Sequence, residues 1–288
     1  MARIDIFSAP LMSRAAYGAP APQTSAALLR KASALARQVP RSFACLRATD
    51  RSYASHPPIV VNSLPKSGTH LMMQIAEALP GAVQYGSFIA QRPSWANWHR
   101  DQAQITARIA KIAPGEVLGA HLHRTDATAQ ALQSLNALHL FIYRDPRAVL
   151  VSEVQYLSLS ARWNALHKRF AEAGDFATQV DLAIDGDGSA ALPDIGARYG
   201  PYLAWRGTPN VMAIRYDELL CTQQRRGVLK AILHRHAELA GRSPDPSLLP
   251  QLQAAIRPWA SHTYTGRDPE RWRHKLTPAQ QRRLAWMA

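Results

Sequence analysis

A lysine, a glycine and two hydroxyl side chains occur together in "PKSGTH", residues 65–70. Lys66 carries a positive charge, and Gly68 allows the backbone to approach a ligand closely. Ser67 and Thr69 add hydroxyl groups that can donate hydrogen bonds. An apolar β-branched run precedes them and a segment with helical spacing follows, so free backbone N–H groups should meet at the turn. The sequence predicts a phosphate-binding turn, and a structural turn with an exposed lysine is the alternative.

A second group with phosphate-binding chemistry lies in "YRDPRAVLVS", residues 143–152. Arg144 follows an apolar run, and Ser152 comes eight residues later in the expected next helix. Ligands of parallel α/β proteins collect at the carboxyl ends of the strands, so Arg144 should share a crevice with Lys66. A guanidinium and a hydroxyl together suit a phosphate. A helix cap flanked by surface arginines is the alternative interpretation.

Strand-like and helical segments alternate from residue 59 onward. The chain contains four apolar runs of strand length: residues 59–63, 116–121, 137–143 and 210–216. A helical segment follows each run, and the one after the third run begins with Asp145 as N-cap and Pro146 in the first turn. This alternation predicts an α/β fold with a parallel central sheet flanked by helices on both faces, a three-layer sandwich.

The N-terminal part differs in composition from the rest of the chain. Residues 1–24 predict a loose leader, and residues 25–47 predict a basic helix that either packs on the protein or lies at a membrane interface. We therefore divide the chain into a leader with a helical extension, residues 1–56, and an α/β domain, residues 57–288.

Two long connections interrupt the alternation. The segment 81–115 is aromatic and polar, and the aromatic side chains of residues 85–99 either stack on a sugar or phenol or pack in the core. The segment 161–200 has helical character with a Gly/Asp turn at "DGDGS". The first of these is the candidate substrate-facing insertion.

Composition restricts the class of partner. Lys and Arg exceed Asp and Glu by 34 − 20 = 14 in a chain of 288 residues, which favours anionic partners such as nucleotides, sulfated substrates, nucleic acid or anionic lipid.

The two cysteines, Cys45 and Cys221, form no C-x-x-C motif, so neither a cysteine metal site nor a disulfide framework is expected. No apolar run approaches the roughly 20 residues that span a bilayer. A cytoplasmic protein is expected, with peripheral membrane association as the alternative.

Together, "PKSGTH" and "YRDPRAVLVS", which begins 78 residues later, resemble the two nucleotide-binding signatures of the sulfotransferase family. The resemblance is firm over residues 59–152 and weaker onward to about residue 272. It implies a three-layer fold of the P-loop nucleotide-binding type. It also implies that the first turn binds the 5′-phosphosulfate of 3′-phosphoadenosine 5′-phosphosulfate (PAPS) and that the second signature binds the 3′-phosphate. The desulfated product would be 3′-phosphoadenosine 5′-phosphate (PAP), and no metal is implied.

The resemblance also assigns individual residues. Arg144 and Ser152 would hold the 3′-phosphate. The 5′ side would be held by Lys66, Ser67, Gly68, Thr69 and the adjoining His70.

His121 in "GAHLHR" matches the histidine that serves the family as general base. An imidazole with an ordinary pKa of about 6.5 can accept a hydroxyl proton at neutral pH. His123 is the rival base. Sulfuryl transfer needs in-line geometry and a positive charge that neutralises the leaving phosphate. Lys66 would provide that positive charge. Tyr216, in "YDEL", matches a family segment for which we expect a structural role.

Two regions depart from the family pattern. His70 stands where the family has a second threonine, and Leu71 stands where an aromatic residue often follows. Adenine stacking and one phosphate contact should therefore come from elsewhere. In "TYTGRDPERW" Trp272 is retained, whereas Arg267 is one position off and is only a candidate for a third contact to the 3′-phosphate.

The sequence-based prediction is a PAPS-dependent sulfotransferase acting on an acceptor hydroxyl, with a carbohydrate or glycolipid favoured over a small phenol. A P-loop kinase or ATPase is the first alternative, but the glycine upstream of the lysine is missing and the lysine precedes the glycine. A non-catalytic protein that binds PAP or polyanions is the second alternative. No specific nucleic-acid-binding signature is present.

Overall fold

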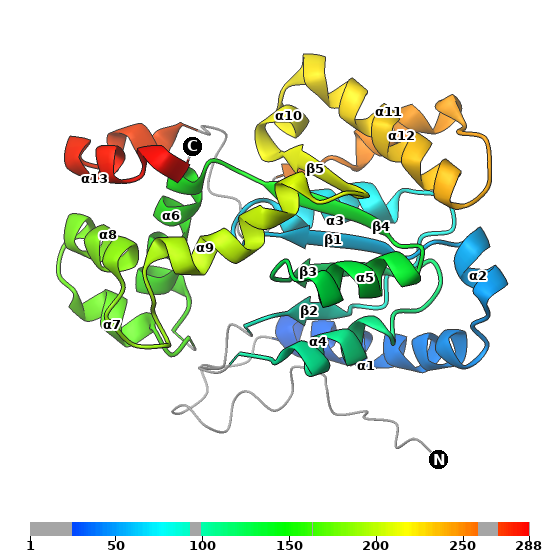
Figure 1. The fold of residues 1–288 in the computed structure, drawn as a ribbon, viewed down its shortest axis with the longest axis horizontal. Helices are drawn as coiled ribbons and strands as arrows, with labels where there is room; N and C mark the ends of the chain where they lie inside the picture. The colour runs from blue at the N-terminus through cyan, green and yellow to red at the C-terminus, as the bar shows by residue number, and fades with distance from the viewer. Residues whose placement is uncertain (1–24, 93–98, 163, 259–269, 288) are drawn as a thin grey trace.

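A five-stranded parallel sheet forms the centre of the computed structural model, which describes residues 25–92, 99–162, 164–258 and 270–287 (Figure 1). The strand order is β2-β3-β1-β4-β5, and Ile59 at the start of the central strand pairs with Val117 on one side and Leu138 on the other. The strands are β1 (Ile59–Ser63), β2 (Phe88–Ala90), β3 (Val117–His121), β4 (Leu138–Tyr143) and β5 (Val211–Arg215). The predicted parallel α/β fold is confirmed.

The strand β2 was not predicted from the sequence. It lies within residues 81–115, which we expected to be an insertion, and it pairs in parallel with the end of β3. It has only three residues and sits at the edge of the sheet, so it shows no apolar periodicity that a strand prediction could use.

Helices cover both faces of the sheet, which explains why the central strands are mostly apolar. Ile59 and Val61 of β1 face one layer, and Val60 faces the other. The first layer contains α3 (Thr69–Glu77), α10 (Tyr216–Leu220), α11 (Thr222–Leu239) and α12 (Leu249–Ala255). The second layer contains α4 (Gln102–Ile109), α5 (Asp126–Ser134) and the turn η3 (Ala204–Gly207).

A third group of helices packs beyond the carboxyl ends of the strands. Asp145 caps the first helix of the group and Pro146 is its first residue, as predicted. Figure 1 shows this group at one end of the molecule, together with the C-terminal helices. Its members are α6 (Pro146–Gln155), η2 (Tyr156–Ser160), α7 (His167–Glu172), α8 (Phe176–Asp185), α9 (Ile195–Leu203), η6 (Arg271–His274), α13 (Pro278–Arg283) and η7 (Ala285–Met287).

Two helices, α1 (Ser25–Leu46) and α2 (Asp50–Ser55), precede β1, and a short turn, η4 (Pro246–Leu248), precedes α12. The helix predicted over residues 25–47 is therefore present, whereas the predicted leader, residues 1–24, lies outside the described residues. Within the described part of the chain, no helix combines the length and the apolar character that crossing a bilayer requires. The division at residue 57 remains a prediction.

Candidate active site

The turn between β1 and α3 has the backbone of a binding loop. Lys66 has φ of 70° and Gly68 has φ of 101°, so both adopt the left-handed region that side chains usually avoid. Gly68 is also the N-cap of α3, and a Cβ at this position would overlap the ring of Tyr216. The glycine is therefore needed for its backbone conformation and for the close approach of Tyr216.

The hydroxyl of Ser67 is the clearest sign of a ligand at this turn. Ser67 is fully buried, and its Oγ has no hydrogen-bond partner among the described residues. An unsatisfied buried hydroxyl costs about 1–3 kcal/mol. An anionic oxygen placed at the start of α3 would accept a hydrogen bond from Ser67, so the residues present fit a phosphate.

The ammonium group of Lys66 lies 4.2 Å from the centroid of the Tyr156 ring. Burial lowers the pKa of Lys66 to about 8; the nearby Glu153 acts in the opposite direction, and the nearby Arg271 lowers the pKa further. Lys66 therefore stays a cation at neutral pH, in a poorly hydrated place where its charge acts strongly.

His121 ends β3 with its Nδ1 atom 3.0 Å from the backbone carbonyl oxygen of Ser63. A carbonyl oxygen can only accept, so Nδ1 carries the proton and Nε2 has the free lone pair. Burial, and to a lesser degree the charges of His70 and Lys66, lower the pKa of His121 to about 4. The imidazole is thus neutral at physiological pH and can accept a proton. Phe88 packs edge-on against it, with 4.9 Å between ring centroids.

Ser63 connects His121 to the turn between β1 and α3. Its hydroxyl lies 2.6 Å from Oγ1 of Thr69 and 3.1 Å from Nδ1 of His121. Thr69, predicted to face the nucleotide, therefore shares one hydrogen-bonded group with the predicted base. The structure brings these two parts of the chain together at the carboxyl ends of β1 and β3.

Tyr216 joins the turn to the second predicted anion site. Its ring packs against Gly68 on one side, and the guanidinium carbon of Arg144 lies 4.9 Å from the ring centroid. Ser152 lies in α6, and its backbone carbonyl accepts a hydrogen bond from the N–H of Tyr156. Arg144 and the turn around Lys66 thus lie at the same edge of the sheet.

His123 has different neighbours from His121. Its ring contacts Tyr202 edge-on at 4.5 Å between centroids and lies 6.1 Å from His99. The aromatic segment 85–99 is divided: Phe88 lies beside His121, whereas Tyr85 is buried. Trp95 and Trp98 lie outside the described residues.

The two departures from the family pattern have different structural outcomes. Leu71 is buried in the core between the sheet and α3, so its side chain packs in the protein interior. His70 is exposed at the start of α3. The candidate contact Arg267 lies outside the described residues, and the retained Trp272 is buried with the Arg147 guanidinium 4.0 Å from its ring centroid.

Sequence reasoning missed four residues of this site: Ser63, Glu153, Tyr156 and Arg271. Tyr156 follows Ser152 by four residues, one helical turn, so the motif could have been extended to it. Arg271 adjoins Trp272 in the sequence and donates from Nη2 to Oε1 of Gln155 at 3.0 Å. No sequence signal identified Ser63.

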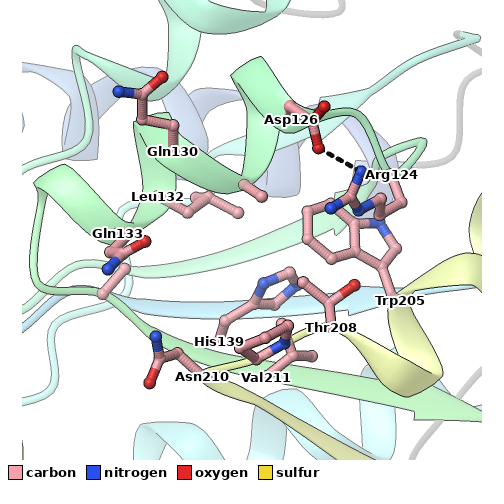
Figure 2. Close-up of a pocket in the computed structure, with 13 residues that line it drawn as sticks. Arg124, Asp126, Gln130, Leu132, Gln133, His139, Trp205, Thr208, Asn210 and Val211 are labelled. Atoms are coloured by element: carbon pink, nitrogen blue, oxygen red, sulfur yellow. Dashed lines mark hydrogen bonds and ion pairs between the residues drawn. The ribbon is translucent and has the colours of Figure 1, made fainter.

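A cavity of about 280 Å³ lies elsewhere, at the amino ends of β4 and β5 (Figure 2). His139 is buried beneath it against Trp205, with 4.5 Å between ring centroids, and burial lowers the pKa of His139 to about 3. Arg124 and Asp126 form an ion pair of 2.5 Å at its edge. No predicted site residue in the described part of the chain lines this cavity.

The fold is a parallel α/β fold of the kind that binds ligands at the carboxyl ends of its strands, and comparison with known families identifies the family. The sulfotransferase domain model matches residues 56–234, more than half of the chain. The protein belongs to this family and is a sulfotransferase. No curated protein sequence matches the chain. Among solved structures, mouse sulfotransferase SULT7A1 complexed with PAP is similar, with 15% identity, coverage of 82% of this chain and 86% of that chain, and a TM-score of 0.49.

Proposed function

We propose that the protein transfers a sulfuryl group from PAPS to an acceptor hydroxyl. The observation that carries this proposal is the hydrogen-bonded connection from Thr69 through Ser63 to His121. It joins a phosphate-binding turn to a neutral histidine. A histidine base next to a bound leaving group is the minimum arrangement for transfer to a hydroxyl.

The nucleotide-binding roles follow from chemistry and position. Lys66, Ser67 and Gly68 lie at the start of α3 and would hold the 5′ side of the nucleotide. Arg144 and Ser152, at the same edge of the sheet, would hold the 3′-phosphate. The other candidate contacts are Thr69, whose hydroxyl pairs with Ser63, the exposed His70, and Arg267, which lies outside the described residues. When bound, PAPS supplies an activated sulfuryl group.

Lys66 and His121 would act on the reaction itself. His121 accepts the acceptor's hydroxyl proton at Nε2, because Nδ1 is held by the Ser63 carbonyl. Lys66 remains protonated below a pKa of about 8 and stabilises negative charge on the leaving phosphate. Such an electrostatic donor commonly contributes about 2.7–4 kcal/mol to lowering a barrier.

For the acceptor, we propose a carbohydrate or glycolipid hydroxyl. The half-exposed ring of Phe88 beside His121 supports this class, because aromatic faces stack on sugars, and the net charge of +14 supports it for anionic glycans. A panel of glycans and phenols assayed for sulfation tests the choice. Efficient sulfation of phenols with no activity on glycans would refute it.

The nucleotide assignment is tested by PAP titration with a thermal-shift readout. At a PAP concentration of about 100 times Kd, the wild type should gain about 2.7 kcal/mol of stability. Lys66→Ala and Arg144→Ala should each bind PAP about tenfold more weakly or worse, since hydrogen bonds to charged groups contribute about 1.5–3 kcal/mol.

Lys168→Ala is the matched control, because Lys168 is exposed on α7 and its side chain is 82% accessible. It should bind PAP like the wild type. Absence of any PAP-induced shift in the wild type would reject the nucleotide assignment. Magnesium-dependent stabilisation by ATP, without a response to PAP, would favour a kinase or ATPase instead.

A further inference from the structure

Helix α1 attaches to the protein through polar side chains. Nε of Arg41 donates to Oε1 of Glu116 at 2.8 Å, and Glu116 is fully buried. Nε2 of Gln38 donates to the backbone carbonyl of Tyr85 at 3.0 Å. The face of α1 that packs on the α/β domain is therefore the polar one.

A second face of α1 is apolar and exposed. Val39, Phe43 and Leu46 are 61%, 56% and 74% accessible. Residues three and four positions apart share one side of a helix, so these three form a stripe, which we call the outer stripe. A helix that buries polar groups and exposes apolar ones reverses the usual pattern of surface helices, so the outer stripe needs an occupant that excludes water.

Charge indicates the nature of that occupant. No acidic residue occurs in α1, and two exposed arginines, Arg37 and Arg47, stand just before and just after the residues of the outer stripe in the sequence. The whole chain carries a net charge of +14. Basic residues beside an apolar helical face are the pattern of helices that lie in the headgroup region of anionic membranes.

The size of the outer stripe also favours a membrane over a second protein. A stable protein–protein interface buries roughly 800 Å² on each partner, more than three side chains on a single helix provide. Figure 1 shows α1 at the lower edge of the molecule, below β2.

We propose that α1 is a membrane-interface helix, with Val39, Phe43 and Leu46 inserted among the headgroups of an anionic bilayer. This docking role is independent of the sulfuryl-transfer reaction. The helix would lie parallel to the membrane surface, and the polar contacts of Arg41 and Gln38 would hold the catalytic domain against it.

Vesicle co-sedimentation of the full chain tests the proposal. Wild-type protein should bind vesicles of phosphatidylcholine mixed with phosphatidylglycerol more tightly than vesicles of phosphatidylcholine alone. The combined variant Val39→Glu, Phe43→Glu and Leu46→Glu should reduce binding to anionic vesicles by at least about tenfold, because it removes the apolar stripe and adds negative charge. Trp286→Glu is the matched control, since Trp286 is 68% accessible and lies in η7, outside α1.

A second variant tests how much the basic residues contribute to membrane binding when the apolar residues are left unchanged. Arg37→Glu combined with Arg47→Glu leaves the outer stripe intact and should also weaken binding to anionic vesicles by at least about tenfold. Both substituted positions are exposed, so circular dichroism should report an unchanged fold. The variant with Arg37→Glu and Arg47→Glu should bind vesicles of phosphatidylcholine alone as the wild type does.

Three results would overturn the proposal. The first is no binding of the wild type to anionic vesicles at low salt, and the second is equal binding by the triple variant. The third is a wild-type dimer, seen by light scattering, that the triple variant dissociates, because the occupant would then be a second copy of the chain. PAP titration of the same proteins reports separately on the nucleotide assignment, so the two proposals can fail independently.

Discussion

The ammonium of Lys66 lies over the ring of Tyr156, 4.2 Å from its centroid. Tyr156 is the first residue of η2, a π-helical continuation of α6, and such wide turns often occur at functional sites. The negative face of an aromatic ring attracts a cation, by up to about 2 kcal/mol where water is excluded. Tyr156 therefore helps Lys66 stay charged despite the burial that lowers its pKa to about 8.

Replacing Tyr156 by leucine should lower the pKa of Lys66 further, because the cation loses its favourable ring contact while remaining partly buried. Tyr156→Phe keeps the ring face and should behave like the wild type. The affinity for PAP, measured between neutral and alkaline pH, should fall at a lower pH in Tyr156→Leu than in the other two proteins. Equal behaviour of the Phe and Leu variants would show that the ring does not act on the ammonium.

Gly68→Ala should disrupt the phosphate-binding turn. Gly68 has φ of 101°, and an added Cβ would overlap the ring of Tyr216, which also contacts the guanidinium of Arg144. Backbone strain of this kind costs about 1–3 kcal/mol. We expect a loss of stability in that range, measured by urea unfolding, together with weaker PAP binding.

Gly227→Ala provides the matched glycine control. Gly227 lies within α11, and a Cβ there would meet nothing within 4 Å. Alanine is favoured over glycine inside a helix by about 1 kcal/mol, so this variant should gain stability and bind PAP normally. If Gly68→Ala were as stable as the wild type, the close approach of Tyr216 would be unimportant.

The sheet was largely predictable from the sequence because its central strands are buried on both faces. The runs that became β1, β3 and β4 are mostly apolar and buried, and the Asp145–Pro146 cap marked the start of α6. The edge strand β5 is only partly buried, but its run of apolar residues was long enough to be recognised. The edge strand β2 left no comparable signal, since three residues cannot establish a period.

The candidate site was predictable only in part. Lys66 and Arg144 could be placed together because both follow parallel strands, whose carboxyl ends meet at one edge. The proximity of Arg271 depends on the path of the C-terminal segment, since its partner Gln155 is 116 residues away. Spacing could not choose between His121 and His123, because residues two apart on an extended chain share a face; their different contacts distinguish them.

The proposed reaction should have two pH limits. His121 must be neutral, which its pKa of about 4 ensures at higher pH, and Lys66 must be protonated, which its pKa of about 8 ensures at lower pH. Activity should therefore fall as the pH drops toward about 4 and again as it rises through about 8. The pH dependence of kcat/KM measures both limits.

Glu153→Gln should move only the alkaline limit. Glu153 raises the pKa of Lys66, so its neutralisation should shift that limit to lower pH by up to about one unit. Glu172→Gln is the control, because Glu172 is an exposed carboxylate on α7. A shift of the acidic limit instead would mean that Glu153 acts through His121.

Arg41 should stabilise the attachment of α1 to the domain. Its guanidinium pairs with Glu116, a fully buried carboxylate that also accepts a hydrogen bond from the N–H of Ala113 at 2.8 Å. Removing one partner of a buried ion pair leaves the other charge uncompensated, at a cost of about 3–5 kcal/mol. Because Arg41 is partly accessible, we expect Arg41→Met to lose about 3 kcal/mol in urea unfolding.

The control for this variant is Arg37→Met, which changes an exposed arginine on the same helix and should alter stability by less than about 0.5 kcal/mol. The double variant Arg41→Met with Glu116→Gln removes the uncompensated charge and should recover part of the lost stability. If Arg41→Met were as stable as Arg37→Met, the ion pair would contribute little to anchoring α1, and the apolar outer stripe would lack the rigid support that membrane docking requires.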